Sequence, residues 1–134
     1  MFRDQEESAV RDHSAKKTIL LVEDDPGNGA FLVQAISQET PYQVLLITDS
    51  FRALEVVRHI KPNLFIIDYY LSTMNGIELY DQLHANSELE ALPAIILSAR
   101  FEEHLHEIEQ RQLVGLSKPL ELDELLATIE QLLG

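Results

Sequence analysis

The chain has 134 residues, of which 46% are hydrophobic, and a formal net charge of −13. This length fits one domain with a substantial core, and the absence of cysteine excludes disulfides and zinc–thiolate sites. No apolar run approaches the roughly 18 residues that a membrane helix needs, and the charged N-terminus has no signal-peptide core. We therefore expect a cytoplasmic protein that does not contact the membrane. The acidity also argues against direct nucleic-acid binding, which depends on cations that neutralise phosphates.

Residues 1–16 are polar and mixed in charge, so we expect a flexible N-terminal tail ahead of one domain over residues 17–134. Within this domain, short runs rich in Ile, Val and Leu alternate with stretches of helical spacing. Such short apolar runs are typical of strands that are buried on both faces. The predicted strands are Thr18–Val22, Val44–Thr48, Leu64–Ile67, Ala94–Leu97 and Leu113–Leu116.

The stretches between the strands predict five helices, with Ser50 capping the second and Asn75 capping the third. Strands that alternate with helices imply parallel units with right-handed crossovers. The sequence therefore predicts a doubly wound α/β domain, whose ligand crevice lies outside the carboxyl ends of the strands. The predicted helices are Ala30–Ser37, Phe51–Ile60, Gly76–Ala85, Glu102–Gln112 and a last helix from about Leu122 to Leu133.

Acidic residues follow two of the predicted strands. Glu23 and Asp24 come directly after the first strand, and Asp68 follows the third. Because parallel strands end at one edge of a sheet, these carboxylates are expected to converge there. Crowded carboxylates repel one another unless they are protonated or bind a cation, and Mg²⁺ suits a site with few protein ligands. A single acid in such a place more often caps a helix or turn, but three on one edge favour a site.

The remaining strand ends add a hydroxyl group and a cation. The fourth strand finishes at Ser98-Ala99 and the fifth at Lys118-Pro119. Taken singly, Ser98 is typical of a turn and Lys118 of a solvated surface charge. Their coincidence at successive strand ends indicates a site that holds a cation and an acidic phosphorylated group together, because lysine is a compact cation able to meet a phosphoryl oxygen.

Four segments resemble the signature segments of response-regulator receiver domains. They stand in the family's order with roughly its spacing, and the resemblance covers about Lys17 to Leu133. It implies a flavodoxin-like (βα)5 fold with strand order 2-1-3-4-5 and a role in two-component phosphorelay signalling. The segments are ILLVEDDP at 19–26, DYYLSTMNG at 68–76, LSA at 97–99 and SKP at 117–119.

Carried over residue by residue, the resemblance makes Asp68 the phosphoacceptor and part of a site for Mg²⁺ or Mn²⁺. Glu23 and Asp24 match the acidic pair of the family, with Asp24 as a direct metal ligand and Glu23 acting through water. The backbone carbonyl of Tyr70 would be a further protein ligand. Asp25 falls one place beyond the pair and is expected to be a loop residue.

The resemblance also assigns the phosphotransfer roles. Ser98 matches the switch hydroxyl and Lys118 the lysine that contacts the phosphoryl group. Asp68 would attack a phosphohistidine of a sensor histidine kinase or histidine phosphotransfer protein, or a small phosphodonor. Self-catalysed phosphotransfer and dephosphorylation at Asp68 are the only chemistry expected, so the chain is not an enzyme in the usual sense.

The sequence departs from the family pattern at several positions. Ser72 and Asn75 stand where Pro and Asp are usual, and both are tolerable loop changes. Tyr70 and Arg100 are bulky residues on opposite lips of the phosphorylation site, with Ala99 next to Arg100. There they would modulate the site by shielding the acyl phosphate from water.

Gly115 is the most consequential departure, because receivers usually carry Tyr or Phe three residues before the lysine as the side chain that reports phosphorylation. The stretch from Ser98 to Lys118 is also shorter than usual. This places the usual output mechanism in question, but not the phosphorylation chemistry. We expect any response to occur in residues 99–113.

Because the sequence stops after the fifth predicted helix, output is expected to pass to an unidentified downstream protein. One alternative is a receiver-like scaffold that binds partners regardless of phosphorylation, which Gly115 favours and the intact site residues disfavour. Another is a flavodoxin-like or phosphatase-type enzyme, but the chain has no Gly-rich phosphate loop and no Asp-x-Asp after the first strand. His104 and His106 do not share a helix face and make a poor metal pair.

Overall fold

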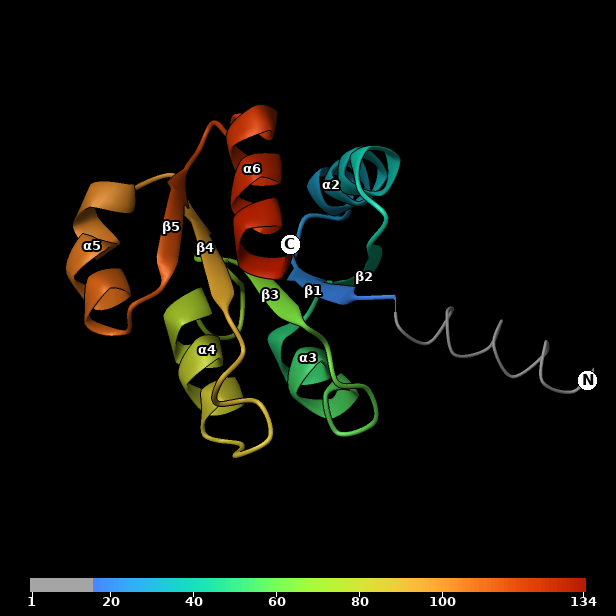
Figure 1. Ribbon diagram of the computed structural model, residues 1–134. Coiled ribbons are helices and arrows are strands. Elements are labelled where there is room, and N and C mark those ends of the chain that lie inside the picture. The colour runs from blue at the N-terminus through green and yellow to red at the C-terminus, as the bar shows by residue number, and fades with distance from the viewer. Residues whose placement is uncertain (1–15) are drawn as a thin grey trace, which may run out of the picture.

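The computed structural model describes residues 16–134, so residues 1–15 of the expected tail lie outside the described part. Within these described residues, five strands alternate with five helices, as the sequence predicts (Figure 1). The strands lie within one residue of their predicted positions. They are β1 (Thr18–Val22), β2 (Gln43–Ile47), β3 (Leu64–Asp68), β4 (Ala94–Ser98) and β5 (Val114–Ser117). The helices are α2 (Pro26–Glu39), α3 (Ser50–Val56), α4 (Gly76–His84), α5 (Phe101–Gln110) and α6 (Leu122–Leu133).

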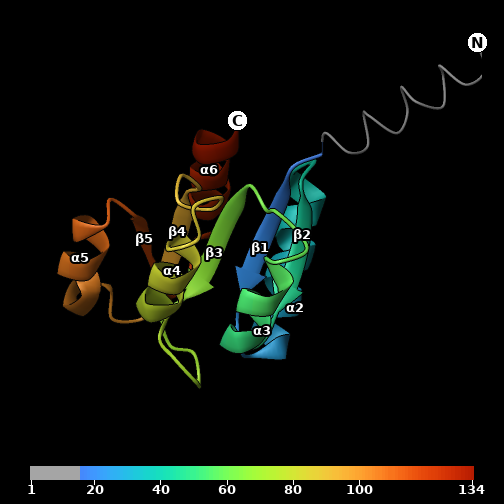
Figure 2. The same cartoon turned by 90° about the horizontal axis from the view of Figure 1, so that it is seen from below.

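All neighbouring strands pair in parallel, and their order is β2-β1-β3-β4-β5, which confirms the predicted flavodoxin-like topology. Val22 at the end of β1 pairs with Ile47 of β2 and with Ile67 of β3. The arrowheads of β1 and β3 point toward the same edge of the sheet (Figure 2). The residues that follow these strands are therefore neighbours.

The sheet separates two hydrophobic cores, because successive strand residues point to opposite faces. Leu20 and Val22 pack on the face covered by α3, α4 and α5. Ile19 and Leu21 pack on the face covered by α2 and α6, which lie together on the other side of the sheet in Figure 1. Burial on both faces explains why the central strands are continuous apolar runs rather than alternating ones.

Helix α2 begins at Pro26, earlier than the predicted Ala30–Ser37. Asp25 lies in the loop before the helix, as predicted, and its carboxylate also caps α2 by accepting hydrogen bonds from the backbone N–H groups of Gly27 and Asn28. Pro26 follows at the first helical position, where its missing N–H is not needed.

The prediction that Ser50 caps α3 is wrong. Asp49 is the cap, since its carboxylate accepts a hydrogen bond from the N–H of Arg52 at 3.1 Å, and Ser50 is the buried first residue of the helix. The prediction of Asn75 as the cap of α4 is confirmed. Asn75 and Glu78 form a reciprocal capping box, in which each side chain accepts from the backbone N–H of the other.

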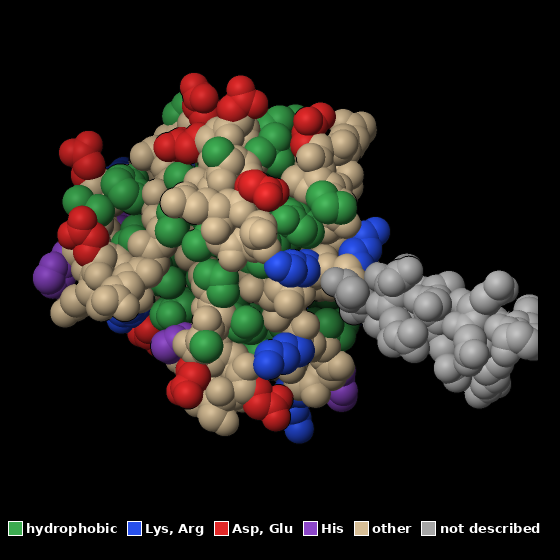
Figure 3. Space-filling model, in the orientation of Figure 1, with side chains coloured by type: hydrophobic (Ala, Val, Ile, Leu, Met, Phe, Trp, Pro, Cys, Tyr) green, Lys and Arg blue, Asp and Glu red, His purple; other side chains and the backbone are tan. Residues whose placement is uncertain are grey.

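Acidic residues outnumber basic ones in the chain, with 23 Asp and Glu against 10 Lys and Arg. On the face shown in Figure 3, they gather above α6 and along the outer side of α5. Within residues 16–134, no helix combines the length and the apolar composition needed to cross a membrane.

Candidate functional site

Three carboxylates converge at the carboxyl edge of the sheet, as their places after β1 and β3 predict. Glu23, Asp24 and Asp68 each offer one oxygen, and these three atoms lie within 4.8 Å of one another. Glu23 and Asp68 are buried, with 2% and 4% of their surface exposed, while Asp24 is partly exposed. This acidic cluster is the only group of potential metal ligands found in residues 16–134.

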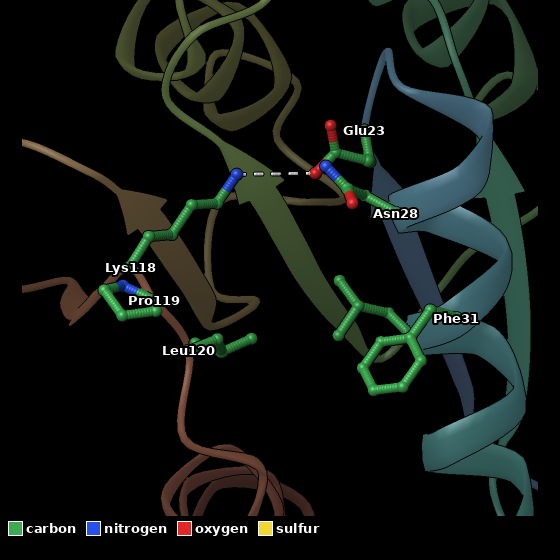
Figure 4. A pocket seen from close by; sticks show the side chains of 7 residues that line it. Glu23, Asn28, Phe31, Lys118, Pro119 and Leu120 are labelled. Atoms are coloured by element: carbon green, nitrogen blue, oxygen red, sulfur yellow. Dashed lines mark ion pairs between the residues drawn. The ribbon is translucent and has the colours of Figure 1, made fainter.

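Lys118 supplies the positive charge of the site. Its Nζ lies 2.7 Å from Oδ1 of Asp68. It also lies 3.6 Å from Oε1 of Glu23, an ion pair that Figure 4 shows reaching across from the end of β5. No other hydrogen-bond donor of the described residues reaches these two buried oxygens. Two buried carboxylates thus share one ammonium group. Carboxylate oxygens are the hard ligands that Mg²⁺ prefers, and these two have no partner other than Lys118 among the described residues, so the residues present fit such a cation.

The electrostatics of the cluster favour a proton or a cation. Burial raises the pKa of Asp68 above its ordinary value, and nearby Asp24 adds to the rise, whereas Lys118 opposes it. Burial likewise raises the pKa of Glu23. Burial lowers the pKa of Lys118, but its contacts with Asp68 and Glu23 outweigh this and leave the pKa raised. The lysine therefore stays charged while the carboxylates remain incompletely neutralised.

Ser98 lies at the end of β4, next to the end of β3. It is fully buried, and its hydroxyl oxygen accepts a hydrogen bond from the N–H of Arg100 at 3.0 Å. Its backbone carbonyl accepts from the N–H of Lys118 at 2.9 Å, which fixes Ser98 against the lysine segment. Ala99 and Arg100 line a cavity of about 580 Å³ that also touches Lys118. The Arg100 guanidinium points to Glu103, 3.2 Å away.

The loop after Asp68 closes tightly on itself. The N–H of Gly76 donates to the carbonyl of Tyr69 at 2.8 Å, and the N–H of Tyr69 donates to the carbonyl of Leu97 at 2.8 Å. A Cβ atom at position 76 would lie 2.5 Å from the backbone carbonyl oxygen of Asp68, so only glycine fits there. The loop that carries Tyr70 is thereby held close to Asp68.

Sequence reasoning missed the contacts of His104. Its ring stacks on that of Tyr69 with centroids 3.5 Å apart, and its Nε2 lies 3.0 Å from the hydroxyl of Tyr70. Tyr70 is 46% exposed but its hydroxyl group points to α5 rather than standing free. No local pattern predicts these contacts, because they join segments far apart in the sequence.

The structure also explains Gly115. A Cβ atom there would lie 2.3 Å from Cε1 of Phe101 and 3.0 Å from Cδ1 of Ile108. The ring of Phe101, from the first turn of α5, therefore occupies the space over β5 that a side chain at position 115 would need.

A cavity of about 220 Å³ lies between α2 and the segment that follows β5 (Figure 4). Glu23 and Lys118 line its inner end, and Phe31 of α2, which is 63% exposed, lines its outer part. Pro119, which follows a cis Lys118–Pro119 peptide bond, and Leu120 line the opposite side. The cavity connects the acidic cluster with an apolar patch on the surface.

The parallel sheet and its acidic edge define a doubly wound α/β domain with a cluster of carboxylates at the carboxyl ends of its strands. The family model of the response regulator receiver domain matches residues 19–130, and the chain belongs to this family. Membership supports a role in two-component phosphorelay signalling.

Relatives occur both as parts of large proteins and as chains of similar size. The chain is 31% identical to the sensor histidine kinase TmoS of Ectopseudomonas mendocina, over 90% of this chain but 12% of TmoS. It is 28% identical to the protein PilH of Pseudomonas aeruginosa, over 87% of this chain and 97% of PilH. It spans only 8% to 18% of three larger relatives, TmoS among them. The structure of the Vibrio cholerae chemotaxis protein CheY4 shares the fold, with a TM-score of 0.80 at 22% identity over 88% of this chain and 99% of CheY4.

Proposed function

We propose that the protein is a response regulator in which Asp68 accepts a phosphoryl group from a sensor histidine kinase or a histidine phosphotransfer protein, in a Mg²⁺-dependent reaction. The signal then passes to a downstream protein through protein contacts. The observation that carries this proposal is the buried carboxylate of Asp68, which is held 2.7 Å from Lys118 beside two further carboxylates. A phosphoryl acceptor needs this combination, since it must lie near a lysine and a cation that stabilise the charge of the transferred group.

Asp24 and Asp68 would hold the cation directly, Glu23 through water, and the backbone carbonyl of Tyr70 would add a ligand. The all-oxygen donor set, with buried oxygens of Glu23 and Asp68 that contact only Lys118 among the described residues, supports Mg²⁺, with Mn²⁺ as the other suitable ion. When bound, the cation neutralises charge on the phosphoryl oxygens.

In the transfer step, a carboxylate oxygen of Asp68 forms a bond to phosphorus while the bond from phosphorus to the donor's imidazole nitrogen breaks, and the imidazole leaves with the electron pair. Lys118 contacts a phosphoryl oxygen. The Ser98 hydroxyl accepts its hydrogen bond from Arg100 and so keeps its own proton available to donate to another phosphoryl oxygen. The protein thus acts by positioning and electrostatics.

The donor histidine would approach from the α2 side. The cavity beside Lys118 opens there toward the exposed ring of Phe31, which offers an apolar anchor to a partner protein. Arg100 lies at the cavity on the other side of Lys118. Arg100 there, and Tyr70 in the loop after Asp68, would modulate access of water to the acyl phosphate.

The test is incubation with acetyl phosphate and Mg²⁺, followed by intact-mass measurement. The parent protein should gain one phosphoryl group, and EDTA should prevent the gain. Asp68→Asn should remove it entirely, whereas the matched change Asp25→Asn, made just outside the cluster, should not. Undiminished phosphorylation of the Asp68→Asn protein would overturn the assignment.

A further inference from the structure

The two residues that follow Asp68 are joined to helix α5 by an aromatic cluster of Tyr69, Tyr70 and His104. The His104 ring lies parallel to the Tyr69 ring, with an interplanar angle of 16° and a centroid distance of 3.5 Å. It also meets the Tyr70 ring edge-on at 5.7 Å and shares a hydrogen bond of 3.0 Å with its hydroxyl group. One side chain of α5 thus contacts both residues next to the phosphoacceptor.

The environment of His104 holds it in this place. Only 12% of its side chain is exposed, and its Nδ1 lies 3.6 Å from Oε1 of Glu107, one turn further along α5. When the Tyr70 hydroxyl donates to Nε2, the proton of a neutral ring is on Nδ1 and faces this carboxylate. Both ring nitrogens and one ring face of His104 are therefore engaged.

The chain between Asp68 and Tyr70 has little freedom to absorb a change at Asp68. The N–H of Gly76 is bonded to the carbonyl of Tyr69, and the Asp68 carbonyl oxygen lies where a Cβ of residue 76 would be. A displacement of this segment must consequently be transmitted to the rings of Tyr69 and Tyr70, and from them to His104.

Helix α5 is packed weakly enough to change its order when a group occupies Asp68. Ile108 is its only buried residue, and four of its ten residues are glutamate. Few buried apolar contacts make a helix one of the less stable parts of a fold. The route through β5 lacks a movable side chain, because position 115 is glycine and Phe101 of α5 fills the space over it.

We propose that His104 is a positioning residue that couples occupancy of Asp68 to helix α5 through Tyr69 and Tyr70. The inference rests on the proposed function, since it requires a group to occupy Asp68. Occupancy shifts the segment of Tyr69 and Tyr70, alters the stack and the hydrogen bond with His104, and changes the order of α5.

The test is hydrogen exchange of residues 101–110 with and without beryllofluoride and Mg²⁺, with occupancy of Asp68 followed separately by fluorine NMR. The parent should show a change of protection in α5 on occupancy. His104→Ala should lose this change while fluorine NMR still shows the bound group. His104→Phe retains a ring that can stack on Tyr69 and so maintains the packing of α5. This variant should keep part of the change of protection in α5. His106→Ala, at an exposed position of the same helix, should behave like the parent.

An α5 response in His104→Ala equal to that of the parent would overturn the coupling. So would a parent protein with occupied Asp68 whose α5 does not respond. A parent that binds no beryllofluoride at Asp68 would instead overturn the proposed function and the coupling with it, and the fluorine signal distinguishes this result from the other two.

Discussion

Replacement of Asp68 by Asn in the cation-free protein removes one charge from the acidic cluster and preserves the size of the side chain. At an effective dielectric constant of 20 and a separation of 4.8 Å, the charges of Glu23 and Asp24 together repel the Asp68 carboxylate by about 7 kcal/mol. The attraction between Asp68 and Lys118 at 2.7 Å offsets about 6 kcal/mol of this repulsion. Water weakens the repulsion between Asp24 and Asp68, because Asp24 is partly exposed. Burial of the charged Asp68 carboxylate destabilises the folded state in addition. We therefore expect Asp68→Asn to raise the free energy of unfolding by about 1 kcal/mol.

The assay is urea unfolding in EDTA, in which the midpoint should rise while the dependence on urea stays constant. Asp25→Asn is the matched control, because it makes the same chemical change outside the cluster and Asn caps a helix about as well as Asp. Addition of Mg²⁺ should stabilise the parent more than Asp68→Asn, since a ligand stabilises the state that binds it.

A lower free energy of unfolding for Asp68→Asn in EDTA, with Asp25→Asn unchanged, would refute this reasoning. It would mean that the ion pair of Asp68 with Lys118 outweighs the repulsion and burial of the carboxylate, and that the apo cluster is a stabilising element.

Three further predictions concern the metal, the pH and the packing of β5. Asp24→Ala should weaken Mg²⁺ binding far more than Asp25→Ala, and equal affinities by calorimetric titration would contradict the ligand set. The raised pKa values of the two buried carboxylates mean that the native state binds their protons more tightly than the unfolded state. Their contribution to stability therefore falls as the pH rises through these pKa values. The excess of the free energy of unfolding of Asp68→Asn over that of the parent should be small at pH 4 and grow toward pH 7, as measured by urea unfolding without Mg²⁺. Gly115→Tyr should lower the melting temperature, because the new Cβ meets the ring of Phe101. Adding Phe101→Ala to the Gly115→Tyr protein should recover part of the lost melting temperature. No recovery would show that the strain lies elsewhere.

Much of the fold follows from local patterns. The central strands are buried on both faces, so their apolar runs mark them within one residue, and their parallel order brings the carboxylates after β1 and β3 to one edge. Asn75 could be identified as a helix cap because capping depends on residues close in sequence. The cap of α3 is less predictable, since Asp49 and Ser50 are adjacent residues that both suit this role and only the structure shows that Asp49 fills it.

What the sequence did not reveal depends on contacts between distant segments. Gly115 could be recognised as unusual, but not the reason, because the ring that covers it comes from Phe101 on another element. The spacing of His104 from His106 argues only about a metal pair and carries no information about the contacts of His104 with Tyr69 and Tyr70. Such pairings are decided by how α5 lies on the sheet, which no local periodicity encodes.

The packing of Phe101 on Gly115 also limits the order in which these two positions can change during evolution. A larger residue at position 115 is accommodated only after the ring at position 101 has been replaced by a smaller side chain, since the reverse order passes through a steric clash. The two positions, although on different elements, should therefore vary together among descendants of this protein. A descendant with an aromatic residue at position 115 of β5 should therefore have a small residue at position 101 of α5.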